Sequence, residues 1–167
     1  MTQPKPLPPV ALLRELFEYD PETGQLTYRV RPKRSRIVVG SIAGNPTQNG
    51  YLQVQVNNQR LLVHRVCWKI HTGQEPPVVL DHVNGNGKDN SIKNLRASSP
   101  HKNQGNRKSS GQYLPGVWPR HHRWQAYTTG HYIGMFDTEE EAHQAYVRWH
   151  LSYFGEHSIY ARDEPSS

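Results

Sequence analysis

Apolar residues in the first half of the chain follow first a helical spacing, then an extended one, then a helical one again. Residues 10–19 carry apolar side chains at helical spacing and predict a helix, and residues 25–30 alternate and predict a strand. Residues 51–56 place every second apolar side chain on one face, as in a half-buried strand. Asn57-Asn58 predicts a hairpin turn, and residues 64–71 again predict a helix.

The second half predicts short strands and two helices. Residues 78–83 form a short apolar strand, a polar loop follows, and residues 94–97 predict a second strand. Ser99 followed by Pro100 is typical of a helix start and predicts a helix over 101–108. Beyond Gly111, three strands are predicted near 116–120, 124–129 and 132–136, followed by a helix over 139–153 that Thr138 caps. We therefore expect an α+β fold.

Charge and cysteine content narrow the class of protein. The net charge of +6 favours a polyanionic partner, nucleic acid before a membrane surface, although a merely soluble cationic protein explains the charge equally well. Cys67 is the only cysteine, so neither an intrachain disulfide nor an all-cysteine zinc site can form. The sequence shows no secretory leader and no long apolar run, so we expect no membrane partner and a cytoplasmic location, in a bacterial host cell.

The segment 79–106, VLDHVNGNGKDNSIKNLRASSPHKNQGN, carries the candidate chemistry. Its strand, loop, strand and helix can bring Asp81, His82 and Asn103 together. The Asp81 carboxylate and the Asn103 amide offer hard oxygen donors that suit Mg²⁺. His82 beside them, but not a ligand, can accept a proton from water near neutral pH. Phosphodiester hydrolysis requires these parts, namely an activated water and a cation at the scissile phosphate.

The same segment resembles the ββα-metal motif of HNH endonucleases, in the phage and group-I-intron homing branch. The resemblance rests on Asp81-His82, Asn94-Leu95 and Asn103. It implies that His82 is the general base, that Asp81 and Asn103 hold one divalent metal, and that Asn94 braces the loop and orients His82. Some family members have His where Asn103 stands, so this chain is expected to use Mg²⁺ or Mn²⁺ rather than zinc or nickel.

An upstream element, His64-Arg65 with Trp68, also resembles the family. Either His64 or Arg65 could approach a phosphate or support the metal site, and the sequence leaves these alternatives open. Arg65 and Arg96 are the expected DNA contacts of this domain.

The segment 111–155 resembles the plant ethylene-response-factor (APETALA-type) DNA-binding domain through G-V-x-x-x, R-W-x-A, I-G-x-F-x-T and E-E-A-x-x-A-Y. In that family the sheet enters the major groove and the helix supports it from behind. The family's arginine after G-V is a tryptophan here, so its base specificity does not carry over. Trp124 is expected either at the DNA or in the core, and Ala142, Ala145 and Tyr146 in the core. The expected DNA-facing residues are Trp118, Arg120, Arg123, Tyr127, Thr129 and Tyr132.

Together these features predict the organisation of the chain and its function. The predicted parts are a disordered tail 1–9, an HNH domain 10–108 with its ββα-metal core at 78–108, a linker 109–111, an APETALA-type domain 112–160 and a disordered tail 161–167. We expect a metal-dependent endonuclease that cuts double-stranded DNA, of phage or mobile-element homing type and monomeric rather than dimeric. The alternatives are a non-catalytic DNA-binding regulator and a structural protein that is basic by accident.

Overall fold

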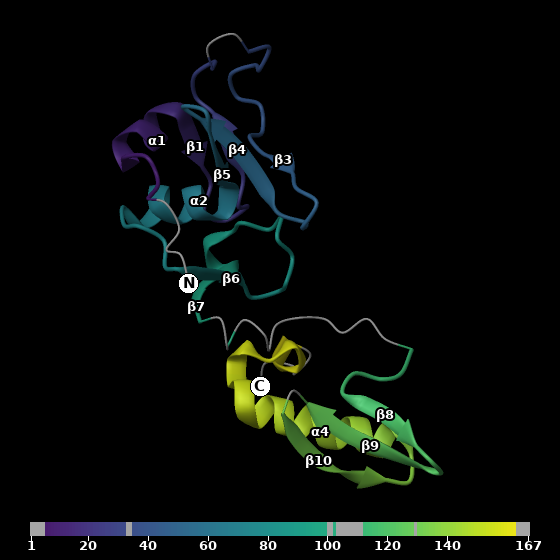
Figure 1. Ribbon diagram of the computed structural model, residues 1–167. Helices are drawn as coiled ribbons and strands as arrows, with labels where there is room; N and C mark the ends of the chain where they lie inside the picture. The colour runs from purple at the N-terminus through teal and green to yellow at the C-terminus, as the bar shows by residue number, and fades with distance from the viewer. Residues whose placement is uncertain (1–5, 33–34, 100–101, 103–111, 129, 163–167) are drawn as a thin grey trace. The chain divides into compact units, whose positions relative to one another are not determined.

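The computed structural model describes residues 6–32, 35–99, 102, 112–128 and 130–162 of the 167. The chain divides into two compact units, residues 1–99 and 100–167, and each is described by itself. The predicted linker at 109–111 lies outside the described residues. The labels used below are those of Figure 1.

The N-terminal unit begins with a short helix and a small hairpin. Helix α1 covers Val10–Leu16, strand β1 covers Phe17–Tyr19, and strand β2 covers Leu26–Tyr28 and pairs antiparallel with β1. The predicted helix over 10–19 is therefore three residues too long. Phe17 has extended backbone angles and pairs with Tyr28, because alternation in Phe17, Glu18 and Tyr19 suits a half-buried strand as well as a helix.

A three-stranded antiparallel sheet and a helix complete the core of this unit. The sheet has the order β3 (Asn45–Pro46), β4 (Leu52–Val56), β5 (Gln59–Leu62), and α2 (Val63–Thr72) follows directly. Asn57 and Asn58 both have positive φ values, 47° and 63°, which confirms the predicted tight hairpin turn. The core is formed by buried residues of α1, both small sheets, α2 and the segments beside them: Leu7, Leu13, Phe17, Leu26, Tyr28, Ala43, Val54, Val56, Leu61, Val63, Val66, Cys67 and Ile70.

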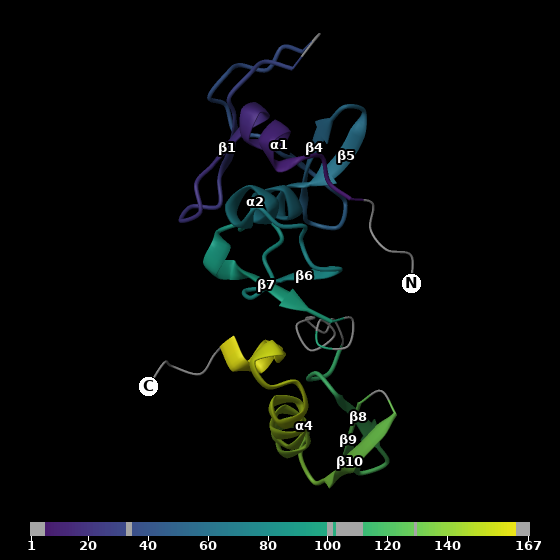
Figure 2. The same ribbon diagram turned by 90° about the vertical axis from the view of Figure 1, so that its left-hand side faces the viewer.

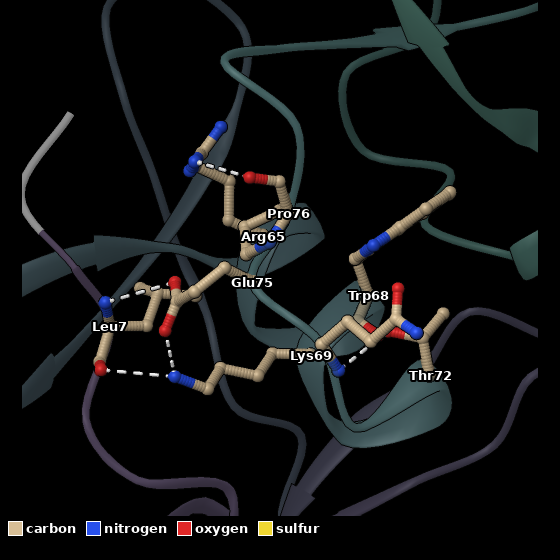
Figure 3. A network of polar contacts seen from close by, with 8 residues as sticks. Leu7, Arg65, Trp68, Lys69, Thr72, Glu75 and Pro76 are labelled. Carbon is tan, nitrogen blue, oxygen red and sulfur yellow. Dashed lines mark hydrogen bonds and ion pairs between the residues drawn. The ribbon is translucent and has the colours of Figure 1, made fainter. Parts of the chain in front are cut away.

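A polar network ties the start of the chain to α2 (Figure 3). The buried Lys69 ammonium forms an ion pair with Glu75 and donates to the Leu7 carbonyl at 3.1 Å, and the Leu7 amide donates to Glu75 at 3.3 Å. The predicted disordered tail 1–9 is thus wrong at Leu7, which is buried in the core. The Pro-rich composition of this segment suggested disorder, because the hydrogen bond that holds Leu7 comes from Lys69, 62 residues away in the chain.

The candidate catalytic segment forms a second hairpin at one end of this unit. Strand β6 covers Val79–His82, a loop with the short 3-10 helix η1 (Ile92–Asn94) follows, and strand β7 covers Leu95–Ser98. The strands are antiparallel, with Asp81 opposite Arg96 and His82 opposite Leu95. Two perpendicular views place α2 between this hairpin and α1 (Figure 1 and Figure 2). Of the predicted helix over 101–108, only Lys102 is described, in helical conformation.

The C-terminal unit is a three-stranded antiparallel sheet covered on one face by a long helix. The order is β10 (His131–Phe136), β9 (Arg123–Thr128), β8 (Val117–Arg120), and α4 covers Glu139–Phe154. Thr138 and Glu141 form a reciprocal capping box at the start of α4. Two 3-10 turns follow, η2 (Gly155–His157) and η3 (Ile159–Arg162). Val117, Ala126 and Ala142 form the core, with Trp124 and Tyr146 packed against it, so Trp124 belongs to the core.

Among the described helices of both units, none has the length and apolar composition needed to cross a membrane.

The turn of the β1–β2 hairpin packs closely on the loop between β6 and β7. The Pro21 carbonyl accepts from the Ile92 amide at 2.9 Å. Gly24 has φ +73°, and a Cβ there would lie 2.2 Å from the Ser91 nitrogen and 2.5 Å from the Asn90 carbonyl carbon. Only glycine permits this approach, because both neighbours are backbone atoms that cannot rotate away.

Replacing Gly24 by alanine should therefore destabilise the protein more than the same change at Gly40. Gly40 has φ +86°, but a Cβ there would meet nothing within 4 Å. Gly40→Ala should cost about 1–2 kcal/mol for the left-handed conformation alone. Gly24→Ala should cost about 1–3 kcal/mol more for the overlap. Urea unfolding of both variants measures the difference in their unfolding free energies. Equal unfolding midpoints would show that Gly24 does not pack closely against the loop between β6 and β7.

Candidate active site

Strand β6 delivers two adjacent polar side chains into the interior of the unit. Asp81 is 7% exposed and His82 is 3% exposed. Because neighbouring residues of a strand face opposite sides, the two side chains have different surroundings. The Asp81 carboxylate accepts from Arg96 on the facing strand, at 3.2 Å from Nε and 3.1 Å from Nη2. Arg96, predicted as a DNA contact, therefore lies against the predicted metal ligand.

His82 lies in a cluster of three rings from three separate parts of the chain. The His64 ring, from the first turn of α2, meets the His82 ring edge-on with centroids 5.0 Å apart. Tyr51, just before β4, lies 5.7 Å from His82 and 5.3 Å from His64. The cluster reduces the access of solvent to the imidazole of His82.

Burial keeps both imidazoles neutral. It lowers the pKa of His64 to about 3, with smaller contributions from His82 and Arg65. Burial also lowers the pKa of His82, although a hydrogen bond with Asn90 and the charges of Asp81 and Asp89 oppose that shift. A neutral His82 imidazole has a lone pair that can accept a proton at neutral pH.

His64 has a buried ring nitrogen whose role the sequence left open. Its Nδ1 atom has no hydrogen-bond partner among the described residues, and the side chain is almost fully buried. Arg65, the other residue of this element, donates to the carbonyls of Pro77 at 2.9 Å and Pro76 at 3.4 Å (Figure 3 shows the second contact). These bonds place the Arg65 guanidinium on the turn between α2 and β6.

Asn94 connects the two ends of the loop that follows β6. Its Oδ1 accepts from the Asn84 amide at 2.9 Å, and its Nδ2 donates to the Asp89 carbonyl at 2.7 Å. The Asn94 carbonyl also accepts from the Val83 amide at 2.8 Å. These three bonds fix the loop at its base.

The amide that meets the His82 ring belongs to another residue. Asn90 Oδ1 lies 3.1 Å from His82 Nε2. Asn90 is 1% exposed, although its neighbours in the sequence are polar and typical of a solvated loop. Sequence reasoning missed both Asn90 and Tyr51, since neither composition nor spacing sets them apart from ordinary loop and strand residues.

The described residues contain only part of the predicted metal site. Asn103, the second predicted ligand, lies outside them. Within the described ranges, no group of three or more His, Cys, Asp and Glu side chains is placed to hold an ion. The Asp81 carboxylate fits a hard cation that takes few protein ligands and keeps several waters.

The outer face of the C-terminal sheet carries most of the predicted DNA contacts. Val117 and Ala126 face α4, so the alternating residues Trp118 and Tyr127 face away from it. Tyr127 pairs across the strands with Tyr132, and Trp118 and Tyr132 are 50% and 54% exposed.

Two arginines lie at the β8–β9 end of the same sheet. Arg120 and Arg123 pair across these strands. Arg123 donates to Asp137 at 2.8 Å and to the Met135 carbonyl at 3.3 Å, so its charge is partly offset by a neighbour. Thr129 lies outside the described residues.

Comparison with known proteins assigns one segment of the chain to a family model. Residues 61–104 match the family model described as HNH endonuclease. The match covers both strands of the β6–β7 hairpin and supports a nuclease that acts on DNA, in a family whose members are generally dependent on a divalent metal. No curated protein and no solved structure matches the chain.

The burial of His64 predicts an acid-dependent loss of stability. Unfolded His64 binds a proton below about pH 6.5, whereas the folded protein resists protonation down to about pH 3. Its contribution to stability is therefore complete above pH 6.5 and is lost as the pH falls toward 3. Each buried neutral histidine lowers the unfolding free energy by up to about 1.4 kcal/mol per pH unit in this window.

His64→Phe keeps a ring against Tyr51 but cannot titrate. Its unfolding free energy, measured in urea between pH 7 and pH 4, should fall less steeply than that of the wild type. Parallel curves for the two proteins would contradict the neutral state of His64.

Proposed function

We propose that the chain is a metal-dependent endonuclease that hydrolyses phosphodiester bonds in double-stranded DNA, with His82 as general base. The observation that carries this proposal is a buried, neutral His82 that follows Asp81 on strand β6, within the segment that matches the HNH endonuclease family. A charged surface alone would suit any DNA-binding protein. A buried neutral imidazole suits proton transfer.

In the proposed reaction, His82 accepts a proton from a water molecule while the water oxygen bonds to phosphorus. The bond from phosphorus to one ester oxygen breaks, and that oxygen takes up a proton from solvent. Asp81, together with Asn103 as implied by the resemblance, would hold one Mg²⁺ or Mn²⁺ ion. The bound ion would offset the negative charge that develops on the phosphate. Asn94 fixes the loop that carries these groups.

Arg96 has a supporting role in this proposal. Its guanidinium lies on Asp81 with two nitrogens close to one carboxylate oxygen. The pair offsets the cost of burying the carboxylate charge and sets its orientation. Arg96 therefore acts on the site through Asp81 rather than by reading DNA.

The C-terminal unit supplies DNA affinity in this proposal. Exposed Trp118, Tyr127 and Tyr132 lie on one face of its sheet, next to Arg120. Aromatic rings can pack on sugars and bases, and arginine can contact phosphate or guanine. The proposed biological setting is a phage or mobile-element homing enzyme that acts as a monomer in the cytoplasm of a bacterial host. A single site cuts one strand at a time.

The general-base role is tested by His82→Ala. Single-turnover cleavage of plasmid DNA with Mg²⁺ should fall about 10²–10⁴-fold, because a positioned base contributes that much. DNA affinity in a gel-shift titration should stay close to that of the wild type. A chelator should abolish cleavage by the wild type.

His71→Ala is the matched control, because His71 is an exposed histidine at the end of α2. It should cleave like the wild type. Near-normal cleavage by His82→Ala would exclude His82 as the base, and a wild-type protein that binds DNA but never cuts it would favour the non-catalytic regulator.

The DNA-binding face is tested by Trp118→Ala and Tyr132→Ala. Each should weaken DNA binding about tenfold, since a buried aromatic contact contributes on the order of 1 kcal/mol or more. Neither should change the salt dependence, because neutral side chains release no counterions. Arg120→Gln should instead reduce the salt slope by about one.

Tyr153→Ala is the control for these variants. Tyr153 is 55% exposed, similar to Tyr132, but lies on α4 rather than on the sheet. Equal losses for Tyr132→Ala and Tyr153→Ala would show that the sheet is not the DNA-binding face.

A further inference from the structure

The hydrogen bonds of Asn90 determine which way its amide points. Asn90 Nδ2 donates to the Lys88 carbonyl at 3.3 Å. A carbonyl only accepts, so the amide nitrogen must face Lys88 and the amide oxygen must face His82. The 3.1 Å contact therefore joins Asn90 Oδ1 to His82 Nε2.

This orientation selects one form of the imidazole. A neutral imidazole has a hydrogen on one nitrogen and a lone pair on the other. Because Asn90 Oδ1 accepts, Nε2 of His82 carries the hydrogen and Nδ1 carries the lone pair. In the other tautomer, two acceptors would face each other in a buried site, which costs about 1–3 kcal/mol.

The β1–β2 hairpin contacts the backbone of Asn90 and fixes its position. The Tyr19 hydroxyl of β1 donates to the Asn90 carbonyl at 2.8 Å. The close approach of Gly24 supports the backbone of Asn90 and Ser91. On the other side, Asp89 accepts from the Ser91 amide at 3.2 Å and from its hydroxyl at 2.8 Å. The amide that faces His82 thus cannot easily change its position.

We propose that Asn90 is the positioning residue of the site, which holds His82 in the tautomer whose Nδ1 accepts the proton, and that the N-terminal hairpin fixes Asn90 in place. This inference rests on the proposed function, since it assigns the orientation of the proposed base. Asn94, to which the resemblance gives this task, contacts the backbone of the loop. The N-terminal hairpin becomes part of the catalytic apparatus although it lies outside the segment 61–104.

The test combines a rate with a spectroscopic signature in the full chain. Asn90→Ala should lower single-turnover cleavage with Mg²⁺ about 10–100-fold, the usual effect of losing a group that orients a reactive side chain. DNA binding should be unchanged. In ¹⁵N NMR spectra at pH 8.5, where imidazoles are neutral, the His82 signals should change from the Nε2–H form to a mixture of tautomers.

Two further variants separate orientation from mere structural support. Asn49→Ala removes an exposed asparagine outside this loop and should leave both readouts unchanged. Asn90→Asp keeps an oxygen acceptor toward Nε2 and should keep the Nε2–H form, at a cost in stability because its second oxygen then faces the Lys88 carbonyl. If Asn90→Ala fails to fold, Tyr19→Phe still tests the proposal, because it removes one hydrogen bond to Asn90 and should slow cleavage about fivefold.

The outcomes separate this proposal from the proposed function. Wild-type cleavage by Asn90→Ala, or slow cleavage with an unchanged tautomer, would overturn the positioning role. If the wild type does not cleave DNA but its His82 tautomer depends on Asn90, the nuclease fails while the positioning role stands.

Discussion

The burial of the His82 imidazole is the constraint on which the rest of the site depends. Burial favours the neutral form and thereby creates a base, but it also requires that each polar atom of the ring be satisfied. Tyr51 and His64 exclude solvent from the ring, and Asn90 supplies the acceptor for its N–H. Helix α2, the start of β4 and the β1–β2 hairpin thus all serve the position of one side chain.

Local patterns predicted much of the fold correctly. The Asn57-Asn58 turn and the capping of α4 by Thr138 each follow from a preference of a few neighbouring residues. The errors arose where distant residues decide. Leu7 is ordered by Lys69 and Glu75, and Phe17 leaves the helix to pair with Tyr28, which no local pattern reveals.

The residues of the candidate site also fall into two groups, those that the sequence predicted and those that only the structure revealed. Asp81, His82 and Asn94 stand out in the sequence because their spacing resembles a known motif. Asn90 and Tyr51 do not, since their importance comes from packing: Asn90 depends on Tyr19, which is 71 residues away in the chain. For Arg65 and Arg96, the sequence suggested a role that the structure does not support. Positive charge suggested DNA, whereas carbonyl and carboxylate partners within the protein engage both guanidinium groups.

The ion pair between Arg96 and Asp81 has a consequence for how the protein can be handled. In small zinc domains the unfolded chain acquires its structure only when the ion binds, so chelation denatures them. Here Arg96 pairs with the Asp81 charge within the protein, and the thirteen buried residues of the core lie within residues 7–70, outside the β6–β7 hairpin. Under the proposed function the ion would therefore bind to a chain that is already folded, so a chelator should stop cleavage without unfolding the protein.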